Sequence, residues 1–84
     1  MTMHKTHPQI IPRLKRAAGH LKSVVVMIEE GKPCVDLAQQ LHAVEQAVAK
    51  AKKALIHDHI EHCLEDGRQA RGSLAEIKDL TKYL

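Results

Sequence analysis

Apolar residues recur at alternating steps of four and three along two long segments, and this repeat constrains the fold most. In the first segment the repeat comprises Ile10, Leu14, Ala17, Leu21, Val24 and Ile28. In the second segment it comprises Leu37, Leu41, Val44, Val48, Ala51 and Leu55. Such a repeat forms the seam of an α-helix that packs against other helices. It predicts two long helices, at about residues 8–30 and 33–65.

Glycine and proline residues mark where these helices end. Gly31 and Pro33 separate the two long segments, as expected for a helix that stops at a glycine before a proline. A polar link between Gly67 and Gly72 precedes a third apolar repeat, which predicts a short helix at about residues 73–84. The expected fold is a single all-α domain, an antiparallel hairpin followed by a short third helix.

The length of the second helix implies a partner chain. At about 1.5 Å per residue this helix is about 50 Å long, more than the diameter of a globule of this size. A chain of 84 residues also buries only about 60% of its unfolded surface. We therefore expect two hairpins to dimerise into a four-helix bundle, with a two-fold axis near Val48.

The composition excludes several classes of protein. The chain has no Phe, no Trp and one Tyr, so it lacks the aromatic platform on which single-strand-binding domains stack bases. Its longest apolar run, residues 24–28, is far shorter than the roughly 20 residues that span a bilayer. Two cysteines are too few for a disulfide-rich secreted scaffold. These features predict a cytoplasmic protein with reduced thiols and no membrane segment.

Positive charge is concentrated in two places. Residues 1–28 hold five basic residues and no acidic one, namely Lys5, Arg13, Lys15, Arg16 and Lys22. A second basic group, Lys50, Lys52 and Lys53, lies in an otherwise acidic segment. Either patch could contact a polyanion or could be a solvated helix face.

Three residues of the second helix have the chemistry and spacing of a metal site. His59 and Cys63 are four residues apart, so they project from one helix face. Cys34 has nearly the same azimuth, but it lies about 37 Å away along the axis. An antiparallel partner helix would bring its Cys34 opposite His59 and Cys63. The alternative is that the cysteines are core residues and the histidine a surface residue.

The remaining chemical signals are weaker. His20, His4 and His7 could supply further nitrogen ligands, although surface roles are favoured for each of them. The chain lacks a nucleophile elbow, a phosphate-binding glycine loop and an H-E-x-x-H motif. We therefore expect no enzymatic activity.

Three stretches of the chain resemble the copper-sensitive operon repressor (CsoR) family, whose members also include nickel, cobalt, formaldehyde and persulfide sensors. The stretches are RLKRAAGHL from Arg13, MIEEGKPCVDLAQQLHAVEQAV from Met27, and LIHDHIEHCLE from Leu55. Together they contain Cys34, His59 and Cys63 at the family's spacing.

The resemblance implies a DNA-binding repressor that responds to a metal. It implies a homodimer or homotetramer, the latter a dimer of dimers, that binds double-stranded operator DNA and releases it when the inducer binds. Cys34, His59 and Cys63 would bind Cu(I) across the dimer interface, with Glu76 as an outer carboxylate. The family's DNA-contacting positions correspond to Arg13, Lys15 and Lys50, which belong to the two basic patches. Arg16 and Lys53 extend those patches as further candidates.

Departures from the family pattern leave more than one metal as a candidate inducer. Copper sensors commonly have Tyr where this chain has Pro33. Family members usually have an arginine before their glycine; this chain has Ala18 there, and Arg16 could substitute for the missing arginine. Thr2 disfavours formaldehyde sensing, and His59 disfavours persulfide sensing. Two thiolates and one imidazole suit Cu(I), whereas Ni(II) or Co(II) would require more nitrogen and Zn(II) is a weaker candidate.

The sequence thus predicts a Cu(I)-responsive repressor that binds DNA in its metal-free form. A Ni(II)- or Co(II)-responsive repressor of the same family is the first alternative. A small metal-carrying protein without a DNA role is the second, in which the basic faces are only solvated.

Overall fold

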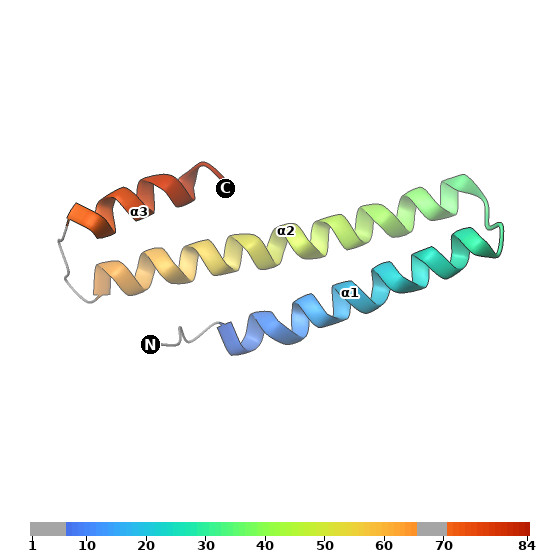
Figure 1. The fold of residues 1–84 in the computed structure, drawn as a ribbon, viewed down its shortest axis with the longest axis horizontal. Coiled ribbons are helices and arrows are strands. Elements are labelled where there is room, and N and C mark those ends of the chain that lie inside the picture. Colours follow the sequence, from blue (N-terminus) through green and yellow to red (C-terminus); the bar gives the residue numbers. More distant parts are fainter. Residues whose placement is uncertain (1–6, 66–70) are drawn as a thin grey trace.

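Three α-helices make up the fold. The computed structural model describes residues 7–65 and 71–84, which form α1 (His7–Glu29), α2 (Cys34–Glu65) and α3 (Arg71–Thr81). α1 and α2 lie side by side as an antiparallel hairpin, and α3 folds back along the C-terminal half of α2 (Figure 1). No strand occurs within these two ranges. The predicted all-α fold of three helices is therefore confirmed.

The turn between α1 and α2 is set by Gly31. Its φ of 73° is a left-handed conformation that costs an L side chain energy. The Gly31 N–H donates to the carbonyl of Ile28 at 3.0 Å, and the Lys32 N–H donates to that of Met27 at 3.1 Å. These two bonds form a Schellman cap, which satisfies carbonyls at the end of α1. The local sequence therefore reverses the chain here.

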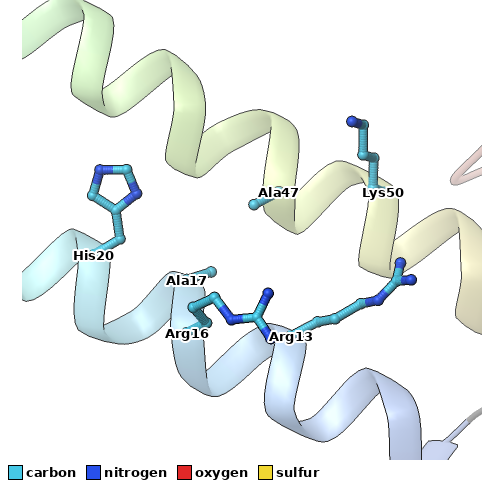
Figure 2. A pocket seen from close by; sticks show the side chains of 6 residues that line it. All are labelled: Arg13, Arg16, Ala17, His20, Ala47 and Lys50. Carbon is cyan, nitrogen blue, oxygen red and sulfur yellow. The ribbon is translucent and has the colours of Figure 1, made fainter.

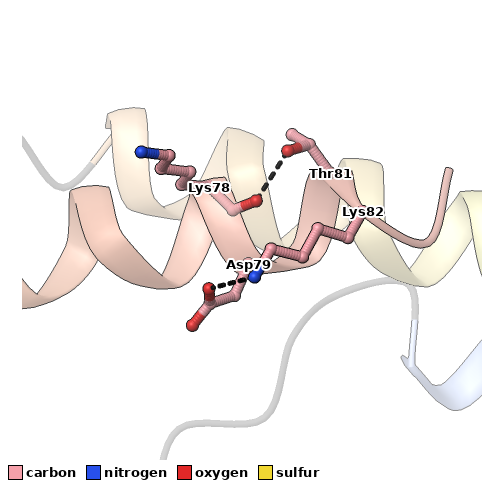
Figure 3. Close-up of polar contacts among 4 residues, drawn as sticks. All are labelled: Lys78, Asp79, Thr81 and Lys82. Carbon is pink, nitrogen blue, oxygen red and sulfur yellow. Dashed lines mark hydrogen bonds and ion pairs between the residues drawn. The ribbon is translucent and has the colours of Figure 1, made fainter.

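The ends of the helices differ from expectation by a few residues. α2 begins at Cys34, one residue after the expected start. The carbonyl of Pro33 accepts the Leu37 N–H at 3.1 Å, so Pro33 caps the helix. α3 begins at Arg71 and ends at Thr81, three residues before the predicted end. The Thr81 hydroxyl donates to the Lys78 carbonyl at 2.6 Å, and Lys82 lies 3.4 Å from Asp79 (Figure 3). The N–H groups of residues 82–84 each bond three residues back, so the helix tightens into a turn.

The core of the hairpin uses only half of the apolar seam. On α1 the buried members are seven residues apart: Ile10, Ala17 and Val24. On α2 the buried residues are Val44, Ala51 and Ile56. All six are small or aliphatic, which agrees with a chain that lacks Phe and Trp. Apolar burial of this kind stabilises the contact between α1 and α2.

The other half of the seam remains exposed in the single chain. On α1 these residues are Leu14, Leu21 and Ile28, with 42%, 45% and 53% of their surface exposed. On α2 they are Leu41, Val48 and Leu55, with 43%, 45% and 40% exposed. We call these six residues the exposed stripe. The single chain is elongated, 54 × 23 × 14 Å, and leaves this stripe on its surface.

Candidate nucleic-acid interface and metal-binding residues

A basic groove lies between α1 and α2. It has a volume of about 320 Å³, and its lining residues are Arg13, Arg16, Ala17, His20, Ala47 and Lys50. Figure 2 shows the two arginines and the histidine on α1, with Lys50 across from them on α2. Ala17 and Ala47 are small, so the two helices leave an opening between the longer side chains. The hairpin thus joins the two basic patches of the sequence at one site.

A second hollow continues the basic surface along α2. It has a volume of about 340 Å³ and is lined by Gln46, Ala49, Lys50 and Lys53. Lys50 lines both hollows, so it connects the arginines of α1 with Lys53. Lys15, the remaining candidate DNA-binding residue, lines neither hollow.

The groove has the chemistry of a phosphate-binding surface. Arginine offers a planar fork of N–H donors to phosphate oxygens, and lysine offers a compact positive charge. The lining includes no acidic residue. Arranged along two helices, these side chains could follow a DNA backbone by charge and shape, without an aromatic residue.

The structure joins two of the predicted metal-site residues. His59 on α2 has its Nε2 atom 2.7 Å from Oε1 of Glu76 on α3. The His59 side chain is 23% exposed, whereas that of Glu76 is 57% exposed. A histidine that binds a metal through one nitrogen commonly donates its other N–H to a carboxylate, which orients the ring. The Glu76 carboxylate is therefore placed to orient the His59 ring.

Cys34 does not meet His59 within one chain. Cys34 is the first residue of α2 and has an exposed, free thiol. His59 lies 25 residues later in the same helix, about 37 Å along its axis. Among the described residues, no three His, Cys, Asp or Glu side chains are close enough to hold a metal ion. The side chain of Cys63 lies outside the described part, although its backbone belongs to α2.

The remaining candidate histidines differ in position. His20 lies in the basic groove, where its Nε2 atom is 2.6 Å from Oε1 of Gln40 on α2. His4 and the side chain of His7 are outside the described residues. His20 is thus part of the candidate nucleic-acid interface.

Gln40, which does not line the groove but contacts His20, was not predicted from the sequence. Its position offered one signal, because it lies three residues after Leu37 and four before Val44, next to the buried seam. A polar residue there usually needs a hydrogen-bond partner. The identity of that partner depends on the packing of α1 against α2.

Comparison with protein families gives one match that covers most of the chain. Residues 6–84 match the family described as metal-sensitive transcriptional repressor. This description concerns repressors rather than enzymes, in agreement with the absence of catalytic motifs in the sequence.

Individual relatives are copper or nickel regulators. The chain is 36% identical over 75 residues to the copper-sensing transcriptional repressor CsoR of Mycobacterium ulcerans, covering 84% of this chain and 63% of that protein. It thus spans slightly less than two thirds of the length of this relative. It is 35% identical over 85 residues to the copper-sensing transcriptional repressor CsoR of Bacillus subtilis, covering 93% and 84%.

A solved structure has the same fold. The nickel-responsive transcriptional regulator InrS superposes with a TM-score of 0.83 at 25% identity, covering 100% of this chain and 99% of that one. None of the described helices is both long and apolar enough to cross a bilayer.

Proposed function

The chain belongs to the metal-sensitive transcriptional repressor family, and from this premise we propose that it binds operator DNA when metal-free and releases it when Cu(I) binds. This function places the protein in the cytoplasm with its DNA target. The observation that carries the proposal is the groove in which Arg13 and Arg16 of α1 lie across from Lys50 of α2.

The DNA interface comprises the groove and the hollow beside it. Arg13, Arg16 and Lys50 contact backbone phosphates, and Lys53 extends the contact along α2. Such contacts release counter-ions, so the affinity falls steeply with salt. Lys15 contacts DNA outside these two hollows, as the family pattern implies.

Two copies of the chain form the binding unit. The exposed stripe supports this arrangement, because its six large apolar side chains continue the seam that closes the hairpin. Packing two stripes together gives a four-helix bundle and removes these side chains from water. A further pairing of dimers would give the homotetramer.

The metal site spans two protomers. Cys34 of one protomer and His59 and Cys63 of the partner subunit supply two thiolates and one imidazole. Cys34 and His59 are too far apart along one helix to bind the same metal ion. In an antiparallel pair of α2 helices, the first residue of one helix lies near the end of the other, so the two residues can meet. Oε1 of Glu76 lies 2.7 Å from Nε2 of His59, and a carboxylate in this position would orient the ring of a metal-binding histidine. Bound metal would supply a cross-link between the ends of the two α2 helices.

Cu(I) is the proposed inducer because of the donor set. Two soft thiolates and an imidazole suit a three-coordinate Cu(I) ion, and the relatives from Mycobacterium ulcerans and Bacillus subtilis are copper sensors by name. Ni(II) is the second candidate, supported by the likeness to the nickel-responsive regulator. It would require a further nitrogen ligand, for which His4 or His7 is available near the chain start.

A DNA-binding titration tests the function. Metal-free protein should bind a duplex from its own promoter region more tightly than a scrambled duplex of the same composition. One equivalent of Cu(I), added in the presence of a chelator that buffers free Cu(I), should weaken that binding by about 100-fold, while Ni(II) should not. Absence of preference for the promoter duplex would favour the metal-carrying protein. Release by Ni(II) alone would replace copper with nickel as the inducer.

A further inference from the structure

A hydrogen bond joins the two helices of the hairpin inside the basic groove. Nε2 of His20 on α1 lies 2.6 Å from Oε1 of Gln40 on α2, and the pair is part-buried. The imidazole N–H donates and the amide oxygen accepts. The two residues are 20 apart in the sequence, so this contact depends on the packing of the helices.

The apolar contact between α1 and α2 does not by itself specify how the helices are aligned. Its buried residues on α1, Ile10, Ala17 and Val24, repeat every seven positions and are all aliphatic. The hydrophobic attraction between such side chains is non-directional. A polar pair in a helix seam is directional, and such pairs specify helix register.

The alignment of α1 on α2 determines the charge pattern of the groove. Arg13 and Arg16 are carried by α1, whereas Lys50 is carried by α2. A shift of one residue along a helix moves a side chain by about 1.5 Å and turns it by about 100°. The spacing between the arginines and the lysine therefore changes whenever α1 slides or rotates.

We propose that the His20–Gln40 hydrogen bond is a latch that holds the cations of the groove at the spacing that fits DNA phosphates. His20 and Gln40 are then positioning residues, and Gln40 acts on DNA only through His20, because it does not line the groove. The inference rests on the proposed DNA-binding function and adds the element that aligns the DNA-binding surface.

A double-mutant cycle measured with metal-free protein tests the latch. The probe is the promoter duplex, and the variants are His20→Ala, Gln40→Ala and their combination. Each single change should weaken DNA binding by about fivefold, as expected for the loss of one hydrogen bond. The double variant should bind no more weakly than either single variant, because one bond is lost in all three.

Two further variants separate the latch from other roles. His20→Gln keeps a side-chain N–H donor of similar reach and should bind DNA within about twofold of wild type. Gln39→Ala, at the exposed neighbouring position on α2, should leave DNA affinity unchanged. Thermal unfolding of every variant checks that the hairpin is folded, and Gln40→Met replaces Gln40→Ala if the latter unfolds.

Each other outcome overturns the latch. Normal DNA binding by Gln40→Ala with weak binding by His20→Ala would make His20 a direct DNA contact. Additive losses in the double variant, or a His20→Gln variant as weak as His20→Ala, would also contradict it. Wild-type protein without preference for its promoter would refute the proposed function, and the latch with it. Normal wild-type binding with unchanged variants would refute the latch alone.

Discussion

Nε2 of His59 lies 2.7 Å from a carboxylate oxygen of Glu76, and this contact joins α3 to the end of α2 that carries the predicted ligands His59 and Cys63. The remaining contact of α3 with α2 is modest, since Ile77 and Leu80 are only partly buried. α3 therefore places a carboxylate beside a predicted metal ligand.

Glu76→Ala should weaken metal binding without weakening DNA binding. Loss of the carboxylate leaves the His59 ring unoriented, and such losses reduce metal affinity by about 10- to 100-fold. Competition with a Cu(I) chelator measures this affinity. Asp79→Ala is the matched control, because it removes an exposed carboxylate on the same helix that pairs with Lys82 at 3.4 Å. Equal losses in the two variants would show that net charge, and not orientation of His59, is responsible.

His59→Ala should separate metal binding from DNA release. Two thiolates can still bind Cu(I) linearly, so the variant should retain measurable copper binding while DNA stays bound in its presence. Cys34→Ala removes the ligand at the opposite end of α2, and it should abolish copper-driven release. Parallel copper titrations and DNA-binding assays measure both properties. Normal copper-driven release by the His59 variant would contradict this account of the switch.

Lys50→Ala should weaken DNA binding and its salt dependence. Lys50 lines both hollows, so its loss removes one phosphate contact. We expect about tenfold weaker binding, or about 1.4 kcal/mol. The slope of log affinity against log salt, measured from about 50 to 200 mM, should fall by about one. Lys78→Ala removes the same charge from α3 and should change neither value. Equal effects of the two variants would indicate that only total charge matters.

Val48→Glu should disrupt the proposed dimer. Val48 lies in the exposed stripe and is 45% exposed in the single chain, so a carboxylate there becomes buried only when two chains pair. Burial of an unpaired charge costs several kcal/mol. Sedimentation equilibrium should therefore show monomer or unfolded chain. Val26→Glu is the control, because Val26 is 46% exposed but belongs to no part of the seam. An unchanged oligomer with Val48→Glu would exclude the stripe as the interface.

Two glycine substitutions should change stability in opposite directions. A methyl group added at Gly31 or at Gly19 would meet no atom within 4 Å, so available space does not distinguish the two positions. Gly31 has a positive φ, and Gly31→Ala should destabilise the fold by about 1 kcal/mol. Gly19 lies inside α1, and Gly19→Ala should stabilise it by up to about 1 kcal/mol. Denaturant unfolding at one fixed protein concentration compares them.

The helices could be predicted from the sequence because their causes are local. The four-three repeat and the Gly31–Pro33 break act over a few residues, and the structure confirms the three-helix fold. α3 spans Arg71–Thr81 where about 73–84 was expected, because Leu84 continues the apolar repeat although the N–H groups of residues 82–84 bond only three residues back. Helix geometry also required that Cys34 and His59 be far apart in one chain.

The candidate site was only partly predictable. Its basic residues were visible as two separate patches, and Glu76 was suggested beside the metal site by family resemblance. The pairing of His20 with Gln40 was not predicted. Many residues of the chain could form a hydrogen bond with an imidazole or an amide. The packing of α1 against α2 is what brings His20 to Gln40.

Three helices, their approximate ends and the faces that carry apolar, basic and sulfur-containing side chains follow from local sequence. The division of the apolar seam between the hairpin and the exposed stripe depends on tertiary packing. Ala17 became buried while Leu21, the larger side chain, remained 45% exposed. Both residues belong to the same repeat. Periodicity predicts the face of the helix on which a residue lies, but not the residues of another helix that it contacts. The neighbour is decided by the angle and register at which two helices meet, which depend on residues distant in the chain.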